Sequence, residues 1–488
     1  MTESAESDET AVRRDRFSGG PARGFLSSLA ADQAIFEADL AVDQAHVVML
    51  AEQEIIEPHT AAEILGALDG IRTDGHGSLP EGEDVHEAIE TAVIDRIGPE
   101  GGRMHTARSR NDEVAACIRF RLREGLLEVA AAVAELRDAL TGVATEHVET
   151  VAPGYTHLQP AQPTTLAHFL LSYEQALARD SGRLLEAYDR VNTSPLGAAA
   201  FAGTPFDIDR HRTADLLGFD GIELNATDAV SGRDFLIESA ADAAALGVTL
   251  SGLAEDLVIY ANKGFVEIDD AYASTSSIMP QKKNPDTLEL IRGTAGDSVG
   301  SLAGVVTTLK GLPRAYNRDL QRAHAGVFET LETVADSVDV AGGAVATASW
   351  DVAALSEAAA TGFSTATGVA DRLAASGVPF RTAHEVVAAA AETSTGEVTP
   401  AALDTAAETH LGESLFAYLS RDELEAALDP GESVANRDSA GGPAPAAVRS
   451  QLTHANSGID DTRDAVTSRR ASLAEAADRR REEVTGYE

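Results

Sequence analysis

The sequence is poor in several residue types, and each shortage limits what the chain can be. Its single cysteine, Cys117, allows no intrachain disulfide, which fits a reducing compartment and predicts an inert buried thiol. Aromatic residues make up only 5%, which argues against a large sheet. The opening residues MTESAESDET are polar and acidic, unlike a secretory signal, and no apolar run reaches the roughly 18 residues of a membrane helix. We therefore expect a cytoplasmic protein without a membrane partner.

Positive charge is also scarce. The 488 residues include 38 Lys and Arg against 79 Asp and Glu, a formal net charge of −41, and lysine occurs only at Lys263, Lys282, Lys283 and Lys310. So acidic a surface repels nucleic acid and anionic lipid. Lysine depletion with excess acid favours a protein built for concentrated salt, where screening weakens self-repulsion. We expect a halophilic protein; the alternative is an acidic protein from an ordinary cytoplasm.

Helical periodicity dominates the chain. Hydrophobic residues make up 44%, enough for a sizeable core, and the heptad spacing of Leu126, Val133 and Leu140 predicts a long helix within 119–149. Similar patterns predict long helices over 164–191, 246–260, 288–309 and 325–347. No run of alternating strand residues is convincing. The fold class is therefore all-α, with a central long-helix bundle whose multi-faced apolar helices favour assembly between subunits.

Common cofactor and metal motifs are absent from the sequence. It has no GxxxxGK[ST] phosphate loop, no HExxH and no CxxC, and its histidines are not spaced like metal ligands. Glycine-rich stretches such as GPEGG lack a preceding strand, so a dinucleotide-binding fold is not expected. What remains are islands of positive charge over 103–112, 274–286 and 310–322, each bordering a long helix. Cations, amides and hydroxyls at helix ends make anion sites, which points to a small polycarboxylate as the substrate.

The stretch STSSIMPQKKNPD, residues 274–286, suggests a reaction. Removing a proton from the carbon next to a carboxylate creates an aci-carboxylate, whose extra negative charge needs cations and N–H donors fixed in place. Lys282, Asn284 and the loop amides could supply them. Ser276 or Ser277 has the right size for the base, provided that the same loop stabilises its alkoxide.

Each of these features also has a structural interpretation. Asp286 could be the N-cap of a helix, with Glu289 closing a capping-box-like pair. His157 could be a hydrogen-bonded structural histidine. The arginines could form an inter-subunit salt-bridge patch (Arg103 to Arg110) or a solvated helix face (Arg314, Arg318 and Arg322).

Four motifs together carry a family resemblance. SSIMPQKKNP resembles the signature loop of the fumarase/aspartase superfamily. With HTARSRNDEV, GYTHLQPAQPTTLAH and GLPRAYNRDLQ it resembles the argininosuccinate lyase family, over a span from about Arg16 to Val448. The resemblance implies β-elimination of argininosuccinate to arginine and fumarate, the last step of arginine synthesis, without metal or cofactor.

The resemblance also implies roles for individual residues. Ser276 matches the base, Lys282 and Asn284 match the groups that hold the succinate carboxylates and the aci-carboxylate, and His157 with Glu289 matches a pair that assists proton transfer to the leaving group. The remaining matches are to substrate contacts: Ser28, Asp32, Arg110, Asn111, Thr156, Arg233, Tyr316 and Gln321.

The chain departs from the family pattern at a few positions. Thr275 stands where a glycine precedes the signature serines, which changes how that loop flexes. Ala107 replaces another common glycine, and Gly232 replaces the first aspartate of SDRD. His324 replaces a common lysine, so we expect a weaker or pH-dependent contact with a carboxylate there.

The family's fold implies three helical domains, which we place at 1–107, at 108–358 (the long-helix bundle with the signature loop) and at 359–488 (a small C-terminal domain). It also implies a homotetramer in which each active site takes motifs from three chains. The alternatives are another fumarate-releasing lyase of the superfamily (adenylosuccinate lyase, fumarase or aspartase) and a catalytically silent structural homologue.

Overall fold

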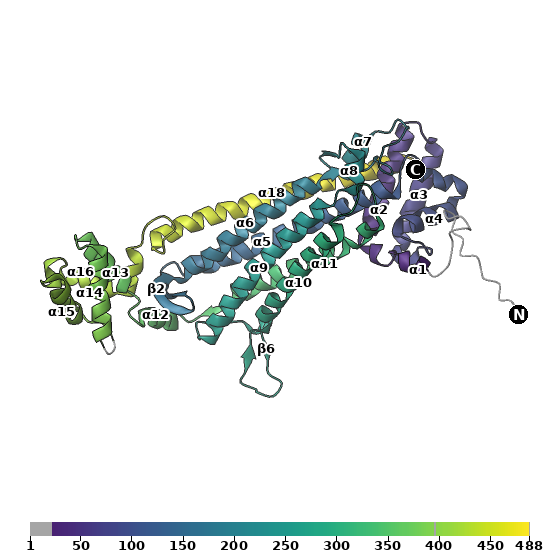
Figure 1. Cartoon of the computed structure of the whole chain (residues 1–488). Helices are drawn as coiled ribbons and strands as arrows, with labels where there is room; N and C mark the ends of the chain where they lie inside the picture. The colour runs from purple at the N-terminus through teal and green to yellow at the C-terminus, as the bar shows by residue number, and fades with distance from the viewer. Residues whose placement is uncertain (1–21, 395–396, 488) are drawn as a thin grey trace.

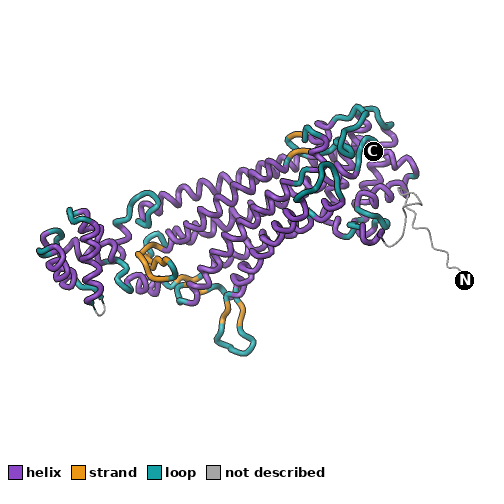
Figure 2. Tube along the Cα trace, in the orientation of Figure 1, coloured by secondary structure: helices purple, strands orange, loops and turns teal. Residues whose placement is uncertain are grey.

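The computed structural model describes residues 22–394 and 397–487. The molecule is elongated, with long helices side by side along its middle and a group of shorter helices at each end (Figures 1 and 2). The all-α fold class is therefore confirmed.

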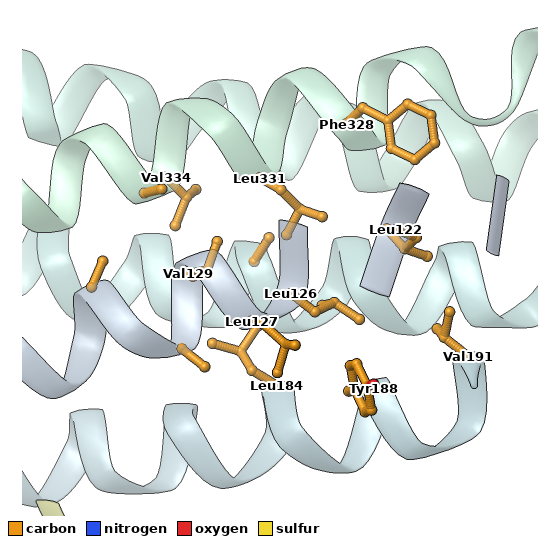
Figure 3. Packing of buried hydrophobic residues seen from close by; sticks show 14 of the residues in the cluster. Leu122, Leu126, Leu127, Val129, Leu184, Tyr188, Val191, Phe328, Leu331 and Val334 are labelled. Carbon is orange, nitrogen blue, oxygen red and sulfur yellow. The ribbon is translucent and has the colours of Figure 1, made fainter. Parts of the chain in front are cut away.

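The long-helix bundle forms where the heptad and 3–4 patterns predict it. Its helices are α5 (Arg110–Glu146), α6 (Leu166–Val191), α9 (Asp234–Asn262), α10 (Asp286–Leu309), α11 (Ala325–Thr347) and α18 (Pro445–Tyr487). The heptad residues Leu126, Val133 and Leu140 are buried, which confirms the seam. Figure 3 shows Leu126 of α5 between Leu184 of α6 and Leu331 of α11.

The helices at the N-terminal end cover one end of this bundle. They are α1 (Ala22–Leu26), η2 (Ala31–Ile35), α2 (Phe36–Glu52), α3 (Pro58–Asp74), η3 (His76–Ser78), α4 (Val85–Ile97) and η4 (Pro99–His105), with α7 (Arg210–Leu217) and α8 (Ala226–Ser231) beside them. Helix α2 is buried on nearly every side, because it packs against α3, α5 and α7.

Shorter helices gather at the other end of the bundle. They are α12 (Val352–Ala360), α13 (Ala366–Ala375), α14 (Phe380–Thr393), α15 (Pro400–Leu411), η7 (Leu415–Ala417), α16 (Arg421–Leu428) and α17 (Pro430–Ala435). Leu355 of α12 still belongs to the bundle core. The buried residues from Val369 to Ala427 make a cluster separate from the bundle core.

Helix α18 differs from the expectation of a separate domain over 359–488. It is 43 residues long, and it returns along the bundle, where it packs against α5 and α6 (Figure 1). Its buried Val448, Leu452 and Val466 belong to the bundle core. The end of the chain is thus shared between two cores, and the three-domain division itself stays a prediction.

The described part of the chain also contains small sheets, which the sequence analysis did not predict. They are antiparallel β1 (Val151–Thr156) with β2 (Gln159–Thr165), parallel β3 (Thr193–Ser194) with β4 (Gly221–Ile222), antiparallel β5 (Val266–Glu267) with β8 (Ser349–Trp350), and antiparallel β6 (Ser274–Thr275) with β7 (Lys283–Asn284). A further turn, η5 (Asp270–Tyr272), precedes β6, and η6 (Arg318–Arg322) precedes α11.

Among the described helices, α9 is long and apolar enough to cross a membrane by length and composition. However, 50% of its most apolar window is buried inside the protein. Core helices of bundles commonly meet the same criterion, and α9 contacts α6, α10 and α11.

Candidate active site

The predicted site residues lie in three places on one chain. One group lines a cavity near α1 and α4, a second lies on the β1–β2 hairpin at the opposite end of the bundle, and a third lies on the β6–β7 hairpin that projects from the bundle's side (Figure 1). The motifs that the sequence analysis groups into one site are therefore separated within a single chain.

The cavity near the N-terminal helices has a volume of about 360 Å³. Its walls come from η2, α4, the first turn of α5, the start of α9, and η6. It brings together most of the predicted substrate contacts: Ser28, Asp32, Arg110, Asn111, Arg233, Tyr316 and Gln321.

Asp32 is a buried carboxylate on the cavity wall. It accepts hydrogen bonds from Ser28 Oγ at 2.7 Å and from the backbone N–H of Val85 at 3.2 Å. Burial raises its pKa above the ordinary value, and the Ser28 hydrogen bond opposes that rise. A carboxylate held this way suits a cationic or N–H-bearing part of a substrate.

Arg110 is placed by the start of α5. Ser109 caps this helix in a capping box with Asp112, so Arg110 is its first residue. Its Nη1 donates to Asp84 at 2.8 Å. Asn111 follows and donates through Nδ2 to the carbonyl of Ala200 at 3.1 Å. The helix N-terminus and the guanidinium together favour an anionic group in the cavity.

Arg233 is the buried cation of the cavity. Its Nη1 donates to the carbonyls of Val230 and Gly232, and within the described structure its Nε and Nη2 have no hydrogen-bond partner. Burial lowers its pKa to about 10, so it remains charged at neutral pH. A buried guanidinium with two unfilled donors is suited to a substrate carboxylate.

His324 lies beside this cation and is also buried. Burial, with a further contribution from Arg233, lowers its pKa to about 4. The imidazole is therefore neutral at physiological pH, where a lysine would carry a charge. His324 lines the cavity, and the expected weaker or pH-dependent contact with a carboxylate stays a prediction.

A cluster of buried charged residues lies next to the cavity, and the sequence analysis did not predict it. Arg108 donates to Asp43 at 2.5 Å and lies 3.1 Å from Glu113. His86 Nδ1 lies 2.8 Å from Asp39. The pKa of His86 rises to about 10 because Asp39 and Glu113 outweigh the effect of burial. In a chain this acidic, the sequence does not distinguish these carboxylates from surface ones.

Two groups in this cluster present ligand-type atoms within 4.8 Å of one another: Asp39 with His86 and Cys117, and Asp39 with Asp43 and Glu113. Arg108 already pairs with Asp43 and Glu113. A metal-binding histidine must be neutral, whereas the raised pKa of His86 favours its imidazolium form. Cys117 is fully buried 3.4 Å from Asp39, and burial raises its pKa well above the ordinary value. The prediction that this thiol is buried is therefore confirmed, and its raised pKa favours the inert thiol form.

Several arginines of the islands have partners within the same chain. Arg103 pairs with Glu100, and the buried Arg108 pairs with Asp43, while the interpretation as an inter-subunit patch stays a prediction. Arg318 Nη1 lies 2.6 Å from Glu83 at the cavity wall, which is more than a solvated helix face requires.

The β6–β7 hairpin distinguishes the two candidate serines. Ser276 is half-buried, and its Oγ accepts from the backbone N–H groups of Ile278 at 3.3 Å and Met279 at 3.1 Å. Ser277 is exposed. Two N–H donors on one Oγ would stabilise an alkoxide, so the geometry favours Ser276 as the base.

The start of α10 corrects the capping interpretation. The helix begins at Asp286, with Pro285 as the N-cap and no side-chain capping bond, so the prediction of Asp286 as N-cap is wrong. Asp286 instead accepts a hydrogen bond from Ser274 Oγ across the neck of the hairpin. Glu289 is exposed, and within the described structure its carboxylate makes no hydrogen bond or ion pair.

The β1–β2 hairpin presents Thr156 and His157 at its tip. The turn residues His157 and Leu158 have φ of 55° and 57°, as a two-residue I′ turn requires. All three side chains are exposed, and the His157 ring makes no hydrogen bond to any described residue. The alternative of a hydrogen-bonded structural histidine therefore has no support in one chain.

The comparisons with known proteins identify the family of this chain. A family model described as lyase matches residues 24–300, and one described as argininosuccinate lyase C-terminal matches residues 363–435. The argininosuccinate lyase of Natronomonas pharaonis is 64% identical over 488 residues, covering 100% of this chain and 99% of the relative.

The chain belongs to the argininosuccinate lyase family. The argininosuccinate lyase of Haloarcula marismortui is 62% identical and covers 98% of this chain and 97% of its own length. Both relatives come from haloarchaea, which agrees with the expected halophilic character. A crystal structure of EDDS lyase in complex with formate matches with a TM-score of 0.86 at 33% identity, over 96% of each chain.

Proposed function

We propose that this protein is an argininosuccinate lyase that releases fumarate and arginine by β-elimination, without a metal or cofactor. One observation carries the proposal: full-length relatives of that name are 62–64% identical. The seven expected contacts that line one cavity support it. The reaction is then the last step of arginine biosynthesis, and the protein works in the cytoplasm.

The elimination needs a base and a stabilised anion. Ser276 takes the proton from the carbon next to a succinate carboxylate, and the electron pair moves into that carboxylate as an aci-carboxylate. Lys282 and Asn284 stabilise this charge. The electron pair then returns from the aci-carboxylate to form the double bond of fumarate, while the carbon–nitrogen bond breaks. The leaving guanidino nitrogen accepts a proton, assisted by His157 and Glu289, and becomes part of arginine.

Recognition of the substrate falls to the cavity. Ser28 and Asp32 hold the arginine end, while Arg110, Asn111 and Arg233 offer donors to carboxylates. Support comes from the two unfilled donors of buried Arg233 and from the carboxylate of Asp32 at the wall. Tyr316, which precedes η6, and Gln321 within η6 line the same cavity, and Thr156 acts from the β1–β2 hairpin.

A homotetramer brings the three places together, with each active site taking motifs from three chains. Two observations support this assembly. The cavity and the two hairpins lie apart on one chain (Figure 1). Helix α10 also leaves the apolar residues Leu290 68% exposed and Val299 49% exposed, a surface that a second copy would cover.

The test is fumarate release, followed by ultraviolet absorbance, from the protein purified in concentrated KCl and given argininosuccinate. Ser276→Ala should fold and assemble normally but lose at least about 100-fold in turnover, because the base is gone. Ser277→Ala is the matched control and should keep turnover within about threefold, since its side chain is exposed.

Retained turnover in Ser276→Ala would refute Ser276 as the base. If the folded wild-type tetramer releases no fumarate, adenylosuccinate, aspartate and malate are the next substrates. Inactivity with all of them would identify a silent structural homologue.

A further inference from the structure

The two adjacent lysines of the β6–β7 hairpin have different surroundings. Lys283 Nζ lies 2.7 Å from Asp270 Oδ1 and 3.1 Å from Glu267 Oε1. Lys282 is exposed and makes no ion pair with a described residue. One lysine is thus occupied by two carboxylates of its own chain, while its neighbour is available to a ligand.

The two carboxylates belong to a segment that is fixed to the bundle. Glu267 ends β5, whose partner strand β8 pairs Ser349 with Glu267 and Trp350 with the buried Val266. Asp270 begins η5, which contacts α11. The ion pairs therefore connect a strand of the projecting hairpin to a segment held by the bundle.

The hairpin has few other attachments. Its ladder consists of the pairs Ser274 with Asn284 and Thr275 with Lys283, and a ladder this short is marginal without support. At its neck, Thr287 Oγ1 donates to the Tyr272 carbonyl at 2.5 Å. The tip between the strands carries Ser276, so its position depends on these attachments.

We infer that Lys283 is a positioning residue for the elimination, acting through Glu267 and Asp270 rather than by touching the substrate. The inference rests on the proposed function of the hairpin. Holding Lys283 to fixed carboxylates restricts where the neighbouring Lys282 and the tip serine lie. Because both acids are largely exposed, each pair contributes modestly, and we expect an effect of about three- to tenfold on turnover.

The first test compares turnover at one KCl concentration in which every variant remains assembled. Lys283→Gln, and the double variant Glu267→Gln/Asp270→Asn, should each lower kcat by about three- to tenfold with KM nearly unchanged. Combining all three changes should cause little further loss, since they remove one interaction. Lys283→Arg should recover most of the activity, because it keeps the charge.

A matched control removes another exposed ion pair of similar length. Glu149→Gln breaks the pair with Arg449, which has a separation of 2.7 Å on a different part of the surface. It should leave kcat unchanged. If Lys283→Gln is impaired while the double acid variant is normal, Lys283 acts on the substrate directly and the inference is overturned.

The second test needs no substrate. Hydrogen exchange of peptides covering 274–286 reports how firmly the hairpin is held, including the Ser276 amide that donates to the Lys282 carbonyl at 3.1 Å. Exchange should be about three- to tenfold faster in Lys283→Gln and in the double acid variant, but not in Glu149→Gln. Equal exchange in all of them would overturn the inference. If the wild type releases no fumarate, the proposed function is wrong. The exchange measurement still tests whether the ion pairs of Lys283 hold the hairpin.

Discussion

At the scale of single residues, the buried charged residues next to the cavity should be the most sensitive to substitution. His86 and Arg108 are cations in a fully buried setting, and each is neutralised by carboxylates from different helices. Burying an unpaired charge is far more costly than burying a matched set. The cluster therefore joins α2, α4 and α5, and because His86 also lines the cavity, it helps to fix the shape of the cavity wall.

The raised pKa of His86 predicts how stability depends on pH. Its folded pKa of about 10 lies above the ordinary value of 6.5, so its stabilising effect is complete below pH 6.5 and is lost as the pH rises towards 10. Between pH 7 and pH 9.5, the free energy of unfolding should fall by about 1 kcal/mol per pH unit from this group, because the folded protein keeps a proton that the unfolded chain loses. Urea denaturation at constant KCl measures that slope.

Two histidine variants test whether His86 causes this pH dependence. His86→Gln should be less stable at pH 7 and should lose most of the slope. His59→Gln changes an exposed histidine near Glu63 and should keep the wild-type slope. An unchanged slope in His86→Gln would mean that this imidazole is neutral in the folded protein.

At the scale of helices, α18 is joined to the bundle by a buried three-helix junction. Arg137 of α5 donates to Glu174 of α6 at 2.9 Å and to Thr462 of α18 at 3.0 Å. Both charged side chains are almost completely buried. Exposed pairs such as Arg463 with Glu135 extend the contact along α18. The junction adds to the buried Val448, Leu452 and Val466 in placing this last helix along the bundle.

Removing one partner of the junction should be worse than removing both. Arg137→Met leaves Glu174 buried and unpaired, and should lower the free energy of unfolding by about 3–5 kcal/mol. Arg137→Met/Glu174→Leu should recover at least half of that loss, because no isolated charge remains. Urea denaturation measures the free energy of unfolding of the single and double variants. A double variant as unstable as the single one would show that packing, not charge, holds α18.

Sequence patterns predict those parts of the fold that depend on neighbours along the chain. The heptads around Leu126 predict α5 and its core seam because helical periodicity is local. The β1–β2 hairpin escapes prediction because prolines such as Pro153 and Pro163 interrupt it, and because its turn uses His157 and Leu158 where glycine or asparagine is usual. The docking of α18 escapes prediction because its partners are distant in sequence.

The same limit applies to the candidate site. The motifs predict which residues take part, and the cavity brings Asp32 and Arg233 together as expected. They do not predict the supporting shell, since Asp39 and Asp43 are two acids among many in an acidic chain. Nor do they predict that Lys283 and Lys282 differ, because that difference depends on the two carboxylates that face only Lys283.

At the scale of the whole molecule, a single chain carries the parts of a site without assembling them. The Arg233 cavity and the Ser276 hairpin lie apart along the bundle (Figure 1). In the proposed homotetramer, the cavity of one chain meets the hairpin of another. Defects in these two parts can then lie on different chains, and a mixed tetramer can contain sites in which both parts are intact.

Mixing two inactive variants should therefore restore activity. Arg233→Met damages the cavity and Ser276→Ala damages the hairpin. When the two chains are co-expressed in equal amounts and assemble at random, about a quarter of the sites combine an intact cavity with an intact hairpin, so activity should approach a quarter of the wild-type value. Mixing Ser276→Ala with Lys282→Ala is the control and should restore none, because every hairpin then carries a defect. Recovery in neither mixture, from tetramers shown to contain both chains, would mean that each site draws its cavity and hairpin from the same chain.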